Sequence, residues 1–228
     1  MALSGFKPSR DTLFAVSYTH LKQLSISQWI PMGHSYGGQL ALLYALQYPQ
    51  RTAKLIYICP SFNLYISMKF VFEKSITLLS QKGQFQKALL LKQTMTRCTT
   101  AQDYVEQLAE IPREIREEVY YSKDWKAEIK ASIASVKATE EQWRNGQKQQ
   151  ALLFQEGCLF EDYMLYLPKI TVPSLLLVGE YDPICPPIQQ KAFLQHAPAG
   201  MLATIPQAGH DAYNDNPEQF IKAVTQFI

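Results

Sequence analysis

Ser35 is the residue of this chain whose neighbours best match those of a catalytic nucleophile. It lies at the centre of the segment Gly33-His34-Ser35-Tyr36-Gly37, which fits the pattern G-x-S-x-G. Glycines on both sides of a serine let the backbone turn sharply between a strand and a helix, so that the hydroxyl stands exposed. A serine hydroxyl is a poor nucleophile unless a base accepts its proton and a third group orients that base. The segment therefore predicts a nucleophile and directs the search to a histidine and a carboxylate.

Asp182 and His210 follow Ser35 in the chain order that such a site requires. Asp182 ends the apolar run 172–182, and His210 lies in a loop after the apolar run 201–206. Open parallel sheets place their sites at the carboxyl ends of the strands, where both residues would lie. The sequence therefore predicts Ser35 as nucleophile, His210 as general base and Asp182 as the acid that orients the base.

Four other ionisable side chains near these positions are assigned lesser roles. Glu180 is a weaker candidate for the acid, because it also lies near the end of an apolar run. Asp211 and Asp215 are interpreted as solvated loop residues. His34 precedes the nucleophile on a tight turn that directs its side chain elsewhere, so we interpret it as a packing residue.

Strand and helix signals alternate around these residues and predict a parallel sheet. A short apolar strand precedes Ser35, an apolar helix follows it, and a second buried strand comes next, all within about thirty residues. Pro31 is unusual in such a strand because proline has no N–H to donate to a neighbour. The predicted elements are helices at 11–25, 36–48, 187–196 and from Pro217, and strands at 26–32, 53–59, 172–182 and 201–206.

The region from 61 to 167 has a different character. Charged residues become more frequent, helical periodicity replaces the strand signals, and no strong strand pattern returns until residue 172. We predict a helical insertion at 61–167 between two core segments, 1–60 and 168–228. The expected fold class is α/β, with a mostly parallel sheet flanked by helices.

The composition is that of a globular chain. It is 47% hydrophobic and 18% charged, with a net charge of +2. This balance gives no electrostatic reason to expect nucleic acid or a membrane as a partner. No apolar run approaches the ~20 residues of a membrane span. The first ten residues lack the apolar core of a secretory signal, and we therefore expect a cytoplasmic protein.

The sequence contains no signature of a metal site or a cofactor site. It has no G-x-G-x-x-G and no Walker pattern, and its cysteines lack the spacing of metal ligands. We therefore expect no metal and no cofactor, and buried or half-buried free thiols in a reducing compartment. The four cysteines are Cys59, Cys98, Cys158 and Cys185.

Three segments together resemble the α/β-hydrolase fold family, in particular its capped serine hydrolases. The resemblance covers nearly the whole chain and is weakest in the insertion, which would be the cap. It implies Ser35 as nucleophile, His210 as base, Asp182 as acid and the backbone N–H of Tyr36 as one oxyanion donor. The matching segments are GHSYGG (33–38), VPSLLLVGEYDPICPP (172–187) and IPQAGHDAYNDNPEQF (205–220).

The chain departs from the family's pattern at its N-terminus. In the family, further strands and a loop rich in His and Gly precede the region that aligns with residue 11, and this loop donates a second oxyanion N–H. We expect these to be missing here, and the loss of one donor typically costs ~10²–10³ in rate. Two hypotheses follow: a working serine hydrolase, or a truncated or degenerate member that acts as a binding protein or is a gene fragment.

The expected substrate is a small molecule or a short peptide with an ester or amide bond. The stretches 33–57 and 177–187 look similar to prolyl aminopeptidase-like members, which hold a free amine with cap carboxylates. Esterase or lactonase activity is equally compatible, whereas dehalogenases usually carry Asp in place of Ser35. The cap carboxylates are Glu106, Glu110, Glu114, Glu117, Glu118, Glu128, Glu140, Glu141 and Glu156.

Overall fold

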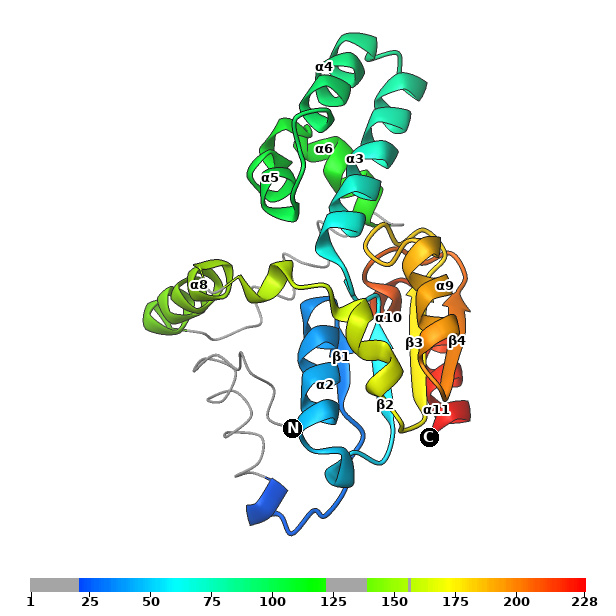
Figure 1. The fold of residues 1–228 in the computed structure, drawn as a ribbon. Helices are drawn as coiled ribbons and strands as arrows, with labels where there is room; N and C mark the ends of the chain where they lie inside the picture. Colours follow the sequence, from blue (N-terminus) through cyan, green and yellow to red (C-terminus); the bar gives the residue numbers. More distant parts are fainter. Residues whose placement is uncertain (1–20, 122–138, 156) are drawn as a thin grey trace.

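Four parallel strands form the sheet that positions the candidate site (Figure 1). The computed structural model describes residues 21–121, 139–155 and 157–228. Each neighbouring pair of strands is parallel, as predicted, so all four carboxyl ends meet at one edge of the sheet. In the order in which they pair, the strands are β1 (Met32–His34), β2 (Leu55–Ile58), β3 (Ser174–Gly179) and β4 (Gly200–Ile205).

β1 is the strand whose predicted bounds differ most from the structure. The prediction was 26–32, but the strand begins at Met32, and Trp29 is joined to Thr52 only by an isolated bridge. Pro31 therefore precedes the strand, and its carbonyl accepts the N–H of Ile56 at 2.9 Å. This pairing uses the backbone acceptor that proline retains and not the donor that it lacks, which accounts for a proline at this position.

Helices cover both faces of the sheet, because alternate strand residues point to opposite layers. Tyr57 and Val178 pack in the cluster that contains α2 and α9, whereas Ile58 and Leu177 pack in the cluster that contains α10 and α11. The first layer consists of α2 (Tyr36–Gln47), η4 (Tyr163–Lys169) and α9 (Pro187–His196), and the second of α10 (Ala212–Asp215) and α11 (Pro217–Phe227).

The described chain between β2 and β3 is helical and has its own apolar cluster. The helices α3 to α6 lie beyond the carboxyl edge of the sheet (Figure 1), and Ile184, from the loop after β3, packs into their cluster. The division of the chain at residues 61 and 167 stays a prediction. The elements are α3 (Leu64–Gln81), α4 (Phe85–Met95), α5 (Ala101–Glu106), η2 (Leu108–Glu110), α6 (Arg113–Tyr120), α8 (Glu140–Gln155) and η3 (Cys158–Phe160); η1 (Pro49–Arg51) lies before β2.

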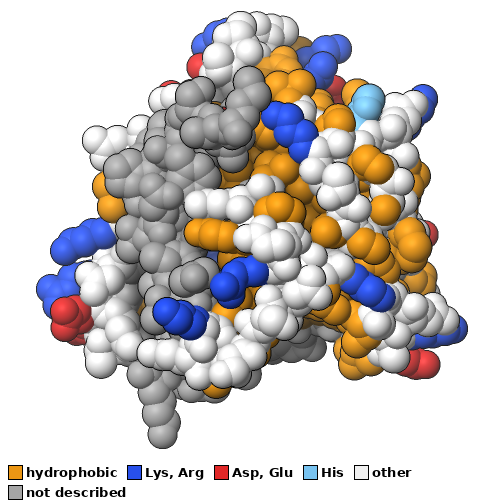
Figure 2. Space-filling model, turned by 60° about the horizontal axis from the view of Figure 1, so that its bottom comes forward, with side chains coloured by type: hydrophobic (Ala, Val, Ile, Leu, Met, Phe, Trp, Pro, Cys, Tyr) orange, Lys and Arg blue, Asp and Glu red, His pale blue; other side chains and the backbone are white. Residues whose placement is uncertain are grey.

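The remaining helices agree with the predicted periodicity. α9 has the predicted bounds, and α11 begins at Pro217 as expected. Most of the helix predicted at 11–25 lies outside the described residues. No helix in the described part of the chain is both long and apolar enough to cross a bilayer. Seen more from the amino ends of the strands, the surface carries apolar side chains among lysines and arginines (Figure 2).

Candidate active site

Ser35 occupies a strained turn between β1 and α2. Its φ of 54° and ψ of −121° lie in a region that residues with a side chain rarely adopt. A Cβ at Gly33 would lie 2.0 Å from the carbonyl oxygen of Gly37, so the turn can close only with glycine at position 33. The N–H of Ser35 donates to the carbonyl of Ile58 at 2.9 Å, which attaches the turn to the end of β2.

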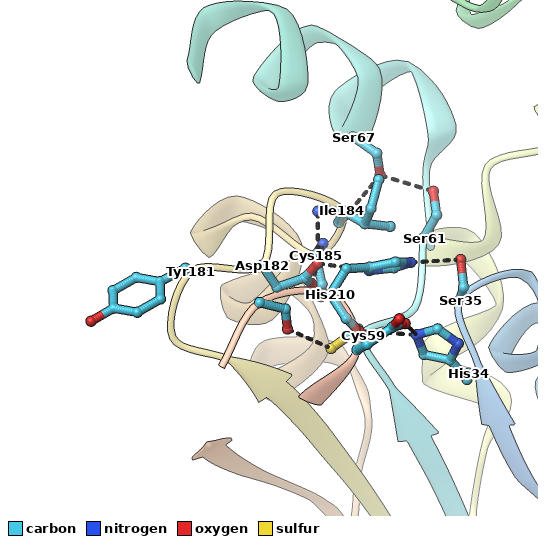
Figure 3. Close-up of polar contacts among 12 residues, drawn as sticks. His34, Ser35, Cys59, Ser61, Ser67, Tyr181, Asp182, Ile184, Cys185 and His210 are labelled. Atoms are coloured by element: carbon cyan, nitrogen blue, oxygen red, sulfur yellow. Dashed lines mark hydrogen bonds and ion pairs between the residues drawn. The ribbon is translucent and has the colours of Figure 1, made fainter. Parts of the chain in front are cut away.

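The structure brings the three predicted residues together (Figure 3). His210 Nε2 lies 3.1 Å from Ser35 Oγ, and His210 Nδ1 lies 2.8 Å from Asp182 Oδ1. An ionised carboxylate only accepts hydrogen bonds, so the proton on His210 is assigned to Nδ1 and Nε2 is left as an acceptor for the serine hydroxyl. This arrangement can move a proton from Ser35 to His210.

Two backbone N–H groups hold Asp182 in place. Ile184 donates to Oδ1 at 3.1 Å and Cys185 donates to Oδ2 at 2.9 Å. The side chain of Asp182 is buried and keeps one face toward His210. Glu180, the weaker candidate for the acid, is exposed and accepts the N–H of Gln207 instead. The carboxylate that contacts His210 therefore comes from Asp182.

Helix α6 holds the backbone of His210 through its last residue. The N–H of His210 donates to the carbonyl of Tyr120, the last residue of α6, at 2.8 Å. The ring of Tyr120 meets the imidazole edge to face, with centroids 5.8 Å apart. Burial, followed by the charge of Asp182, raises the pKa of the Tyr120 phenol well above its usual range. Tyr120 therefore stays neutral and can contact the imidazole without adding charge.

His34 is more than the packing residue that the sequence predicted. Its Nε2 lies 3.0 Å from the carbonyl oxygen of His210, and a carbonyl only accepts, so this nitrogen carries a proton. The His34 ring also packs against the rings of His210 and Tyr213, with centroids 4.7 and 5.3 Å away. Burial, followed by the charge of His210, lowers the pKa of His34. A neutral imidazole thus supports the backbone of His210.

The prediction that Asp215 is solvated was wrong. Its side chain is buried, and Oδ2 accepts the N–H of Gly209 at 2.7 Å. Asp211 is half-buried, with its carboxylate 3.7 Å from His34 Nε2. Asp215 therefore holds the residue before His210, and the short α10 brings it back to the loop. The sequence around Asp211 and Asp215 has no periodicity that could have shown which of the two is buried.

Cys59 places a buried thiol beside Asp182 and His210. The ligand atoms of the three residues lie within 4.8 Å of one another, and Cys59 Sγ lies 3.9 Å from the carbonyl oxygen of Gly209. Burial, followed by the charge of Asp182, raises the pKa of the Cys59 thiol. Metal binding requires the thiolate, so the cluster fits a hydrogen-bonded arrangement better than a metal site. All four cysteines are free and buried, as predicted.

A fully buried amide, Gln189, links the loop that carries the acid to the first turn of α3. Its Oε1 accepts the N–H groups of Phe62 and Asn63 at 2.7 and 3.0 Å. Its Nε2 donates to Ser67 Oγ at 2.9 Å and to the carbonyl of Ile184 at 3.3 Å. Gln189 lies on an ordinary amphipathic helix, and nothing in the sequence distinguished it from an exposed glutamine.

Ser67 completes this link (Figure 3). Its Oγ donates to the carbonyl of Ile184 at 2.6 Å and lies 2.8 Å from Ser61 Oγ. Because the N–H of Ile184 donates to Asp182, the carbonyl and the N–H of this one residue connect α3 to Asp182. The network consists of buried polar groups that satisfy one another, which is the condition for such groups to specify one geometry.

Tyr36 is the first residue of α2, next to Ser35. The first N–H groups of an α-helix point out from its N-terminus, where the helix dipole favours negative charge. The position therefore suits the expected oxyanion donor. A cavity of ≈ 460 Å³ opens at the end of α6 and is lined in part by Tyr120, Tyr121, Arg116 and Glu117. It adjoins the site through Tyr120, which contacts His210.

A comparison of the sequence with family models decides the ancestry of this site. Residues 11–217 match the family described as alpha/beta hydrolase fold, which is most of the chain. The chain belongs to the alpha/beta hydrolase fold family. The resemblance noted in three short segments of the sequence is thereby confirmed, as are the α/β fold class and the parallel sheet.

Several solved structures share this fold at low sequence identity. A proline iminopeptidase-related protein from Thermus thermophilus has a TM-score of 0.69 at 17% identity, covering 96% of this chain and 72% of that chain. An esterase from Exiguobacterium antarcticum has a TM-score of 0.58 at 18% identity, covering 98% and 78%. An alpha/beta fold family hydrolase from Bacillus anthracis has a TM-score of 0.63 at 19% identity, covering 100% and 77%. At these identities the likeness shows the fold alone.

One curated protein matches with a different printed activity. It is a 1-acylglycerol-3-phosphate O-acyltransferase of Saccharomyces cerevisiae, 22% identical over 227 residues. The match covers 86% of this chain and 54% of the relative, so this chain spans about half the length of that protein. The proteins to which this chain is similar thus carry different printed names, among them an esterase, a proline iminopeptidase-related protein and an acyltransferase.

Replacing His34 by phenylalanine should reduce the pH dependence of stability. Because the pKa of His34 is lowered in the folded protein, the unfolded chain takes up the proton first as the pH falls through about 6.5. The free energy of unfolding should therefore fall below this pH in the native protein and fall less in His34→Phe. Urea denaturation at about pH 5 and about pH 7.5 measures the free energy of unfolding at each pH. An equal change in this free energy between the two pH values in both proteins would contradict the prediction.

Replacing Gln189 by leucine should destabilise the protein and slow any turnover. The substitution leaves the N–H groups of Phe62 and Asn63 without their acceptor, at a cost of about 1–3 kcal/mol for the buried Phe62 N–H and less for the half-buried Asn63 N–H. Gln195→Leu, at an exposed position on the same helix, is the matched control and should change stability by less than about 0.5 kcal/mol. Urea denaturation of both variants measures the difference, and equal stability would show that the network contributes nothing.

Proposed function

We propose that this protein is a serine hydrolase that cleaves an ester or amide bond of a small substrate. The proposal rests above all on the hydrogen-bonded chain Ser35–His210–Asp182, with distances of 3.1 and 2.8 Å. Three residues far apart in the sequence meet in the order and geometry of a nucleophile, a base and an orienting acid. Membership of the alpha/beta hydrolase fold family supports the same chemistry.

In the first half of the reaction, Ser35 Oγ attacks the carbonyl carbon of the substrate while its proton passes to His210 Nε2. Asp182 accepts the hydrogen bond from Nδ1 and stabilises the imidazolium that forms. The negative charge that develops on the carbonyl oxygen is stabilised by the N–H of Tyr36 at the N-terminus of α2. The bond to the leaving group then breaks, and His210 returns the proton to the leaving alcohol or amine.

The second half releases the acyl group from Ser35. A water molecule attacks the acyl-serine carbonyl and gives its proton to His210 Nε2. The bond to Ser35 Oγ breaks, the serine recovers its proton from His210, and the free acid leaves. Because Asp182 and the carbonyl of Tyr120 hold His210 from two sides, the same imidazole can serve both half-reactions without moving.

Ser35→Ala should abolish hydrolysis of a short-chain activated ester, with a loss of at least about 10³-fold in kcat. Ser80→Ala, a serine on α3 whose Oγ donates to the carbonyl of Ile76, is the control and should keep the native rate. Covalent labelling by a fluorophosphonate should follow the same pattern. Equal rates for the native protein and Ser35→Ala would overturn the hydrolase proposal and leave the reading of a binding protein that has lost activity.

Acyl transfer is a second candidate, favoured by the match to the yeast acyltransferase. It uses the same acyl-serine, but the hydroxyl of an acceptor takes the place of water in the second half. With an acyl thioester as donor and 1-acylglycerol-3-phosphate as acceptor, we expect free acid as the main product. A diacylated product that requires Ser35 would instead establish transfer, and product analysis by chromatography distinguishes the two.

A prolyl aminopeptidase-like activity is the third candidate, and the cap carboxylates bear on it. Glu106, Glu110, Glu114, Glu118, Glu140 and Glu141 are exposed, and Glu128 and Glu156 lie outside the described residues. Glu117 is half-buried, lines the cavity beside Tyr120 and pairs with Arg113 at 2.7 Å. An amine-binding role would fall to Glu117, and its engagement with Arg113 makes esters the preferred class for the first assays.

A further inference from the structure

The charges of the cap are strongly segregated. Residues 64–97, which span α3 and α4, carry six of the chain's 22 Lys and Arg but only one of its 20 Asp and Glu. The overall net charge of +2, which gave no reason to expect a membrane partner, conceals this local excess of positive charge. Helix α4 itself has two lysines, Lys87 and Lys92, and no acidic residue. Both lysines are exposed, and within the described residues neither is paired with a carboxylate.

The outer face of α4 is apolar. Phe85 is 67% exposed, and Leu89 and Leu90 are each 53% exposed. The inner face of the same helix buries Ala88 and Leu91. Phe85 and Leu89 are four residues apart, so they lie one above the other on the same side. We call the exposed side chains of Phe85, Leu89 and Leu90, with the flanking Lys87 and Lys92, the α4 outer face.

Exposure of single apolar residues is common, and other parts of this surface also show it (Figure 2). Helix α9 also combines exposed apolar side chains, Ile188 and Leu194, with one exposed lysine and no acid. The α4 outer face carries three such apolar side chains and two lysines, and it lies beside α3, which adds further lysines. α4 also lies at the end of the helical region farthest from the sheet (Figure 1). The exposed fractions of Phe85, Leu89 and Leu90 leave these side chains open to a flat surface.

We infer that the α4 outer face docks this protein on the surface of a membrane that contains anionic phospholipid. Phe and Leu side chains of an interfacial helix enter the boundary between headgroups and acyl chains, while flanking lysines pair with the phosphates and carboxylates above it. A membrane with anionic headgroups is negatively charged at its surface and apolar beneath, so it complements the lysines and the apolar side chains of the α4 outer face. The inference concerns the cap and does not depend on the proposed hydrolysis.

The test measures sedimentation of the protein with lipid vesicles. The protein should bind vesicles of phosphatidylcholine with about one-third phosphatidylserine at least about tenfold more strongly than vesicles of phosphatidylcholine alone, and salt should weaken the binding. The double variant Lys87→Gln/Lys92→Gln should lose about tenfold or more of the binding to anionic vesicles. Phe85→Ser/Leu89→Ser should lose a similar amount, because it removes the inserting side chains.

Matched controls come from α9 and α11, the helices that pack on the sheet. Lys191→Gln/Lys222→Gln removes two exposed lysines, and Ile188→Ser/Ile221→Ser removes two apolar side chains that are each 61% exposed. These variants should bind vesicles like the native protein. Absence of vesicle binding, equal binding to neutral and anionic vesicles, or equal losses in the control variants would each overturn the inference. Circular dichroism of every variant verifies that the cap helices remain folded, and ester hydrolysis, measured separately, reports on the catalytic proposal.

Discussion

The hydrogen bond between Asp182 and His210 is the contact on which the arrangement of the site depends. Both residues lie in loops, so no strand fixes either of them, although the parallel register of β3 and β4 brings the two loops to the same edge of the sheet. The acid is then held by two backbone N–H groups after it, and the base by the carbonyl of Tyr120. A 2.8 Å contact between two loops requires anchors of this kind, because a loop backbone without them can adopt many conformations.

These anchors come largely from outside the sheet. Tyr120 ends α6, and Ser67 and Gln189 connect the first turn of α3 to the carbonyl of Ile184. The helices between β2 and β3 therefore do more than lie beyond the carboxyl edge, because α3 and α6 help to hold Asp182 and His210. A change in the position of α3 would reach the imidazole through Ser67, Ile184 and Asp182. A change in α6 would reach it through the backbone hydrogen bond between His210 and Tyr120.

Prediction from sequence succeeded where local periodicity and the general geometry of parallel sheets were sufficient. The parallel sheet follows from apolar runs separated by helices, and the meeting of Ser35, Asp182 and His210 follows from the rule that parallel strands place their carboxyl ends together. It failed at β1, since an apolar run containing a proline does not reveal at which residue pairing begins. It also failed at Asp215, because whether a loop aspartate is buried depends on how the loop folds back on itself.

The sequence by itself determined the family, the order of strands and helices and the residue types that can form a nucleophile, base and acid, because local periodicity and turn chemistry are written in neighbouring residues. Only the tertiary structure decided which distant groups support them. His34 meets the carbonyl of a residue 176 positions away, and Gln189 meets Phe62 across 127 positions. In both contacts a polar side chain meets a backbone group, and nearly every residue carries the same backbone groups. The sequence therefore shows no pattern for these contacts, and chain packing alone selects the partners.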